Sequence, residues 1–196
     1  MTDLLTGLFA SKVRAAVLVY LLPRAHRGYS LTELARATGL STSSLQHECY
    51  KLVDLGVLRD RREGNARRYR PNLEHPAFAP LTALVTAAVG VGPMLRAAIE
   101  DLDIDGQVAI AGTLAPTATP AALLVIGNVP FARFADLESR LAPLLAILGL
   151  PMPALTYYRR DDWDARLLSG NALVAAWRTG PGYSLIGPPI VPSWDA

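Results

Sequence analysis

The chain has 196 residues, of which 51% are hydrophobic and 18% charged, and its formal net charge is +2. This balance supports a packed core in one large or two small domains and argues against intrinsic disorder. The single cysteine, Cys49, excludes an internal disulfide, and no apolar run is long enough to span a membrane. The first residues, MTDLLTGLF, lack a basic segment, so we expect no signal peptide and a cytoplasmic protein without membrane association.

Charge is distributed unevenly along the chain. Residues 1–76 carry 12 Lys and Arg against 7 Asp and Glu, a net charge of +5, whereas residues 77–196 carry −3. Six of the basic residues fall between Arg59 and Arg70. A basic amino-terminal half suits a polyanionic partner, and the acidic remainder does not.

Two helices are predicted before residue 40. Apolar residues at near-helical spacing predict the first over residues 12–22, which Pro23 ends. A short strand at residues 29–30 leads into the second. Ser30 and Glu33 have the spacing of a capping box, and Gly39 is a typical helix terminator.

A third helix is predicted after the Ser-rich segment 41–44, whose hydroxyls can cap it, and Gly56 ends it. Helical spacing places Leu45, Cys49, Leu52 and Leu55 in one buried stripe. The opposite face carries hydrogen-bonding groups of mixed length, as a helix that reads base edges in the major groove requires. Counting the cap, we expect DNA contacts from Ser41, Ser43, Ser44, Gln46, His47, Tyr50 and Lys51.

An arginine-rich hairpin is predicted next. One strand starts at Val57-Leu58, residues 63–65 (Glu-Gly-Asn) have turn chemistry, and residues 67–70 return as the second strand. Together with the preceding helices, this order is that of a winged helix-turn-helix. Basic residues on such a wing contact phosphates or enter the minor groove. We expect these contacts from Arg61, Arg62, Arg67, Arg68 and Arg70.

The remaining chain divides into two parts. Residues 77–103 form connecting helices, and the apolar helix predicted over residues 78–91 is either core or the seam of a homodimer. Residues 104–196 alternate between short apolar strands and helices, which is typical of a small α/β layer domain. The predicted fold class is therefore α+β, with a winged helix-turn-helix over residues 1–76 and an α/β domain over residues 104–196.

The two-part arrangement resembles bacterial and archaeal regulators that join an ArsR-like winged helix-turn-helix to a nucleotidyltransferase-fold domain. In the first half the resemblance rests on LFASKVRAAVLVYLL, LTELARATGLSTSSLQHECYKLVDLGVL and RREGNARRYRPNLEHPAF. In the second half it rests on AIAGTLA, AALLVIG and YYRRDDWDARLLSGNALVAAW. The resemblance spans nearly the whole chain and implies a DNA-binding regulator whose carboxy-terminal domain has a nucleotidyltransferase-like fold.

The resemblance also indicates where catalysis would fail. Nucleotidyltransferases of this type have a Gly-Ser turn after the first strand and then two acidic residues, one apart, which hold a divalent metal on the nucleotide phosphates. Here the turn reads Gly112-Thr113, and Pro120 and Ala122 occupy the positions of the two carboxylates. A third acid, expected over residues 155–158, is missing too. We therefore expect no enzyme activity and no cofactor, and a domain kept as a scaffold, a dimerisation surface or a sensor pocket.

Metal sensing is not expected in the first half either. Metal-responsive ArsR-like relatives place thiolates, often in pairs, on or beside the recognition helix, whereas this chain has Cys49 alone and helical spacing turns it inward. A lone buried cysteine usually behaves as a small apolar residue.

These patterns favour a sequence-specific transcriptional regulator that binds double-stranded DNA as a homodimer. Two alternatives stay open, a nucleotidyltransferase enzyme and a module for protein–protein interaction. The sequence also leaves room for an unidentified small-molecule effector. It does not reveal the operator or whether the chain represses or activates.

Overall fold

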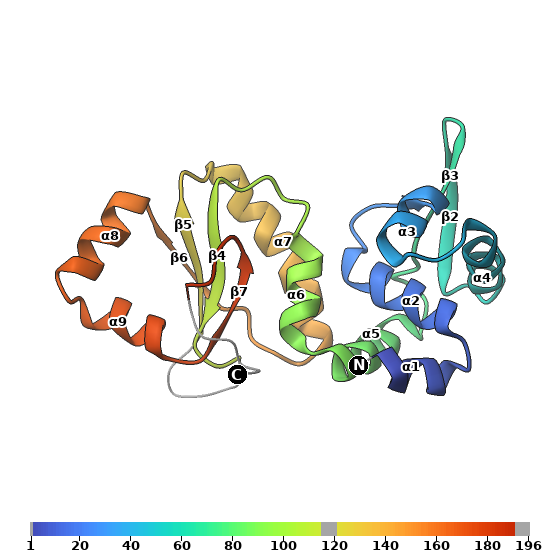
Figure 1. The fold of residues 1–196 in the computed structure, drawn as a ribbon, viewed down its shortest axis with the longest axis horizontal. Helices are drawn as coiled ribbons and strands as arrows, with labels where there is room; N and C mark the ends of the chain where they lie inside the picture. Colours follow the sequence, from blue (N-terminus) through green and yellow to red (C-terminus); the bar gives the residue numbers. More distant parts are fainter. Residues whose placement is uncertain (1, 115–120, 191–196) are drawn as a thin grey trace. The chain divides into compact units, whose positions relative to one another are not determined.

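The computed structural model describes residues 2–114 and 121–190, which form two compact units, Met1–Ala97 and Ala98–Ala196 (Figure 1). The boundary lies within the segment 77–103 that was expected to connect two domains. Both units combine helices with a sheet, which confirms the predicted α+β class.

The first unit contains six helical segments and three strands among its described residues, in the order of a winged helix-turn-helix followed by a further helix. They are α1 (Thr2–Phe9), α2 (Lys12–Leu21), the 3-10 helix η1 (Leu22–Arg24), β1 (Tyr29–Ser30), α3 (Leu31–Thr38), α4 (Thr42–Asp54), β2 (Leu58–Glu63), β3 (Ala66–Pro71) and α5 (Phe78–Val89). Helix α6 (Val91–Ile99) then crosses the boundary between the units.

Local sequence signals account for the ends of α3 and α4. Ser30 and Glu33 form the predicted capping box, in which each side chain accepts a hydrogen bond from the backbone N–H of the other residue. Gly39 ends α3 in the left-handed conformation at φ +69°, as predicted. The hydroxyl of Ser41 caps α4 by accepting from the backbone N–H of Ser44.

The wing is an antiparallel hairpin of β2 and β3, with β1 added to the outer side of β3. Glu63 pairs with Ala66, so Gly64 and Asn65 form a two-residue turn. Gly64 has φ +59° and Asn65 does not have a positive φ, which is the pattern of a type II′ turn. This turn fixes the register that brings the wing arginines opposite one another.

The core of the first unit follows the predicted stripe of α4 with one exception. Leu45, Cys49 and Leu52 are buried, whereas Leu55 is 62% exposed. The prediction for Leu55 was wrong because α4 ends at Asp54 and Leu55 is its C-cap, after which the chain turns at Gly56. Position along an ideal helix therefore no longer determines which way Leu55 points.

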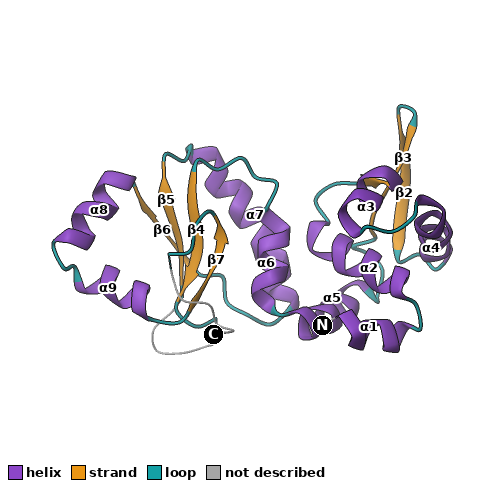
Figure 2. Cartoon of the chain, in the orientation of Figure 1, coloured by secondary structure: helices purple, strands orange, loops and turns teal. Residues whose placement is uncertain are grey.

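The second unit is built on a four-stranded mixed sheet of order β6-β5-β4-β7. Strands β5 and β6 are parallel and joined through α7, whereas β4 pairs with its two neighbours in antiparallel fashion. Figure 2 shows α7 on one face of this sheet and α8 with α9 on the other. Its elements after α6 are β4 (Gly106–Ala111), β5 (Ala122–Gly127), α7 (Phe131–Ile147), β6 (Ala154–Tyr158), α8 (Arg160–Leu168), α9 (Ala172–Thr179) and β7 (Gly182–Ile186).

Strands β4 and β5 form the centre of the second unit, and nearly every residue in them is buried. Leu124 and Ile126 of β5 pack against Trp163 of α8 and Val174 of α9. These strands read as continuous apolar runs because both faces of the sheet are covered by helices. This explains why the sequence located them without an alternating pattern.

Candidate nucleic-acid interface

Helix α4 presents its polar face to solvent, as the sequence predicted. All seven side chains expected to contact DNA from this region are exposed: Ser41, Ser43, Ser44, Gln46, His47, Tyr50 and Lys51. The buried stripe on the opposite side anchors the helix in the core. The polar face of α4 is thereby presented to solvent.

A buried ion pair also anchors α4. Nε of Arg14, in α2, donates to Glu48 at 2.6 Å, and the Glu48 side chain is only 7% exposed. Next to it, burial raises the pKa of the Cys49 thiol to about 12, with a further contribution from the Glu48 charge. The thiol is therefore neutral at physiological pH, in agreement with its predicted structural role.

The ladder of the wing places six arginines directly opposite one another in three rungs, Arg59 with Arg70, Arg61 with Arg68, and Arg62 with Arg67. Like charges at opposed positions destabilise an antiparallel pair. In each rung one arginine has a carboxylate partner, whereas among the described residues the other has no ion pair. The first set is Arg59, Arg67 and Arg68, and the second is Arg61, Arg62 and Arg70.

Arg68 is held by partners within the first unit. Its guanidinium donates to Glu33 at 2.9 Å and to the Gly28 carbonyl at 3.2 Å, and its Nε lies 3.0 Å from Glu63 without hydrogen-bond alignment. A Cβ atom at Gly28 would lie 2.9 Å from Cβ of Arg68, so only glycine gives room for this approach. Arg68 therefore ties the wing to the start of α3.

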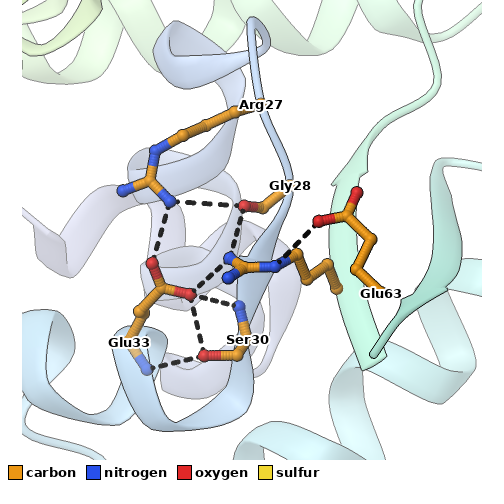
Figure 3. Close-up of polar contacts among 6 residues, drawn as sticks. Arg27, Gly28, Ser30, Glu33 and Glu63 are labelled. Carbon is orange, nitrogen blue, oxygen red and sulfur yellow. Dashed lines mark hydrogen bonds and ion pairs between the residues drawn. The ribbon is translucent and has the colours of Figure 1, made fainter. Parts of the chain in front are cut away.

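The carboxylate of Glu33 is the centre of this network. It accepts hydrogen bonds from the backbone N–H and hydroxyl of Ser30 and from the guanidinium groups of Arg27 and Arg68 (Figure 3). Burial alone would raise its pKa, but the hydrogen bonds from Ser30 and Arg27 and the charge of Arg27 outweigh it and lower the pKa to about 2. The group is ionised at all physiological pH values.

Arg67 is also engaged, but toward the recognition helix. Its Nε forms an ion pair with Asp60, and its guanidinium lies over the ring of Tyr50, 4.9 Å from the centroid. The hydrogen bond and charge of Asp60 raise the pKa of Arg67 above its usual range. The hydroxyl of Tyr50 in turn accepts from the Gln46 amide at 2.9 Å. The wing and α4 are thus linked through side chains.

The structure therefore divides the five wing arginines that the sequence treated alike. Arg61, Arg62 and Arg70 are exposed cations without ion pairs among the described residues, whereas Arg67 and Arg68 have internal partners. The carboxylates concerned, Glu33 and Asp60, were missed as electrostatic partners. The sequence did contain a signal for Asp60, because its negative charge lies in a predicted hairpin strand opposite a strand rich in arginine. It contained no such signal for Glu33.

The second unit does not present a metal-binding cluster among the residues the structure describes. Gly112 follows β4 with φ +95°, and the buried Ala122 begins β5, as the resemblance led us to expect. Pro120 lies outside the described residues. Strand β6 is Ala-Leu-Thr-Tyr-Tyr and offers no carboxylate.

An open surface pocket of about 320 Å³ lies beside the turn between α8 and α9. Its lining combines apolar atoms with an amide, a hydroxyl and a guanidinium, from Leu167, Gly170, Asn171, Ala175, Arg178 and Thr179. This volume is at the lower end of the range for small-molecule sites.

No single helix in the described part of the chain is both long and apolar enough to cross a membrane. Two sharply bent helix pairs, residues 3–9 with 12–24 and 78–89 with 91–99, meet the length and composition required, which by itself is weak support for a span.

Comparison with known proteins agrees with the geometry of the first unit. Residues 12–62 match the profile of the IclR helix-turn-helix domain, which covers α2, α3, α4 and most of β2. This match supports a DNA-binding transcription regulator and confirms the predicted helix-turn-helix. It does not confirm the ArsR-like assignment or the fused nucleotidyltransferase domain, which stay predictions.

The other comparisons add no functional information. A search of curated proteins gives no significant match. Among solved structures, human N-acetylserotonin methyltransferase in complex with SAM is similar at 16% identity and a TM-score of 0.30, over 50% of this chain and 33% of that one. A likeness at this level carries no argument. The family-level similarity is therefore confined to residues 12–62, which are similar to the IclR helix-turn-helix domain.

Proposed function

We propose that this chain is a sequence-specific transcriptional regulator that binds double-stranded DNA, with α4 in the major groove and the β2–β3 wing on the flanking backbone. One observation carries the proposal. The exposed polar face of α4 lies next to a wing whose Arg61 and Arg62 have no ion pair among the described residues. Polar side chains on a helix can read base edges, and unpaired arginines bind phosphate.

The two groups of side chains would have different roles. Gln46 can form the two hydrogen bonds that distinguish adenine, and Ser43, Ser44 and His47 can reach base edges or phosphates from the same face. Lys51 and the unpaired wing arginines supply charge that displaces counterions from the duplex. Specificity would come from α4 and most of the salt dependence from the wing.

A homodimer would give this module a two-fold symmetric target. Two copies of α4 would read a pseudo-palindrome whose half-sites lie about one helical turn apart. In the first unit Leu84 of α5 and Leu4 and Leu8 of α1 are exposed, and α1 contacts α5. Exposed leucines on two contacting helices are candidates for a dimer seam, which the sequence offered as one of two readings of the helix over residues 78–91.

For the second unit we propose an inactive nucleotidyltransferase-like domain that serves as a scaffold or a sensor. The order of elements from α6 through β4, β5, α7 and β6 and the glycine turn after β4 support this fold. The absence of carboxylates at Ala122 and in β6 supports its inactivity. An unidentified small-molecule effector would have the open surface pocket beside the α8–α9 turn available to it.

The function is tested by selecting bound duplexes from a random pool and then titrating the selected duplex at several salt concentrations. We expect a selected pseudo-palindrome and an affinity that falls steeply with salt. Arg61→Gln should reduce the slope of log K against log salt by about 0.9 for each phosphate that the variant no longer neutralises, with unchanged base preference.

Arg159→Gln, which removes an exposed arginine from the second unit, is the matched control and should leave the slope unchanged. Absence of salt-dependent duplex binding by the parent protein would refute the proposal.

A further inference from the structure

A continuous chain of side chains joins the wing to the recognition helix. Asp60 of β2 pairs with Arg67 of β3, the guanidinium of Arg67 covers the ring of Tyr50 in α4, and the Tyr50 hydroxyl accepts from the amide of Gln46. Tyr50 and Gln46 are one helical turn apart, so they lie on the same exposed face of α4. These contacts connect the β2–β3 hairpin to Gln46, the side chain on α4 that is best suited to bind adenine.

Arg67 is poorly arranged for a phosphate. Asp60 pairs with its Nε and offsets its charge, and its guanidinium lies over the ring of Tyr50, 4.9 Å from the centroid. Its neighbour across the ladder, Arg62, is exposed and has no ion pair among the described residues. Two arginines on the same rung therefore differ in the one property that counterion release requires, which is an uncompensated charge.

The contact with Tyr50 gives Gln46 a defined orientation. Tyr50 accepts one of the two amide hydrogens of Gln46, which leaves the other hydrogen and the carbonyl oxygen for a partner. Those two groups are what a bidentate contact with adenine uses. A side chain fixed in this way before binding loses less rotational freedom on binding than a mobile one.

We infer that Arg67 is a positioning residue for base readout, which holds Tyr50 in place so that Tyr50 can orient Gln46, and that Arg67 is not a phosphate ligand. This inference rests on the proposed function, because it concerns how the same interface distinguishes base pairs. It assigns the wing a part in sequence specificity as well as in affinity. Asp60 takes part in the same arrangement, because its ion pair with Arg67 keeps the guanidinium over the Tyr50 ring.

The test uses the full-length chain and the duplexes selected with the parent protein. Gln46→Ala identifies the base pair that depends on Gln46. Tyr50→Phe removes the hydroxyl acceptor but keeps the ring under Arg67. The double variant Asp60→Asn with Arg67→Gln removes the cation over the Tyr50 ring without changing net charge. Arg62→Gln is the matched variant on the same rung. Thermal unfolding of each variant shows whether it is folded.

We expect Tyr50→Phe and the double variant to reduce discrimination about fivefold at the base pair that Gln46→Ala identifies, with the salt slope unchanged. Arg62→Gln should do the opposite, lowering the slope by about 0.9 while base preference stays the same. These opposite responses separate positioning from charge.

Uniform weakening on all sequences by the double variant, or unchanged base preference in Tyr50→Phe, would overturn the inference while leaving the proposed function in place. Absence of duplex binding by the parent protein would overturn the proposed function and this inference with it.

Discussion

The two central hairpins of this molecule are built on opposite principles. Strands β2 and β3 of the wing and strands β4 and β5 of the second unit are both antiparallel pairs with six residues in each strand. In the wing half of the strand residues are exposed and opposed arginines are offset by carboxylates, whereas β4 and β5 are buried and almost entirely apolar. The comparison shows that one backbone arrangement serves as a surface for a partner or as a core, depending on the side chains alone.

Removing a core side chain from β5 should give the largest effect. Leu124 is fully buried and packs against Trp163 and Val174, so Leu124→Ala should lower the free energy of unfolding by about 2–5 kcal/mol, because apolar burial is reduced and a cavity is left. Denaturant titration followed by tryptophan fluorescence measures it. A cost below about 1 kcal/mol would contradict the view that packing holds this hairpin. Under conditions where the Leu124→Ala variant is fully folded, its affinity for DNA should equal that of the parent protein.

Removing an engaged arginine from the wing should give a moderate effect. Arg68→Ala leaves Glu33 and the Gly28 carbonyl without one donor, so we expect a loss of about 1–2 kcal/mol, discounted because the side chain is 30% exposed. Arg61→Ala, on the same rung but without an ion pair among the described residues, should stay within about 0.5 kcal/mol. Equal losses in the two variants would erase the distinction between the two sets of arginines.

Acid should weaken the first unit through Glu33. Its folded-state pKa of about 2 lies below its ordinary value of 4.5, so its contribution to stability is fully present above about pH 4.5. That contribution is lost as the pH falls from about 4.5 toward 2. Unfolding measured across this range should show a stability slope that Glu33→Gln reduces. An identical slope in the two proteins would exclude Glu33 as its source.

The smallest effect concerns Cys49. Because burial raises its thiol pKa to about 12, the thiolate is negligible at pH 7 and Cys49 should react with a thiol reagent only when the first unit unfolds. Labelling with and without denaturant measures this. Rapid labelling of the native protein would show that α4 opens locally and is less firmly anchored than the Arg14–Glu48 pair indicates.

Sequence reasoning recovered the elements that leave a local signal. The capping box at Ser30, the helix end at Gly39 and the turn at Gly64 each depend on residues a few positions apart, and the structure confirms all three. The apolar runs of β4 and β5 were found for the same reason. Helix α1 was not predicted, although Leu4, Leu5 and Leu8 have helical spacing and Asp3 lies in the first turn.

The division among the wing arginines could not be predicted in this way. It depends on contacts between residues far apart in sequence, such as Arg68 with Glu33 and Arg59 with Glu74. The sequence shows six arginines between residues 59 and 70 but not which of them pair with carboxylates. Counting all of them as available to a polyanion therefore gave too high a number. Which cations remain available is decided by tertiary structure, because only folding brings the carboxylates to them.

The three arginine rungs of the wing have a consequence for how the module responds to ionic strength. Each rung retains one uncompensated positive charge next to a second guanidinium, so mutual repulsion persists along the hairpin. Added electrolyte screens that repulsion and relaxes the isolated wing, while the same electrolyte weakens its attraction to a polyanion. A bound phosphate backbone supplies the missing counter-charge directly, and the hairpin is then more rigid in the complex than alone.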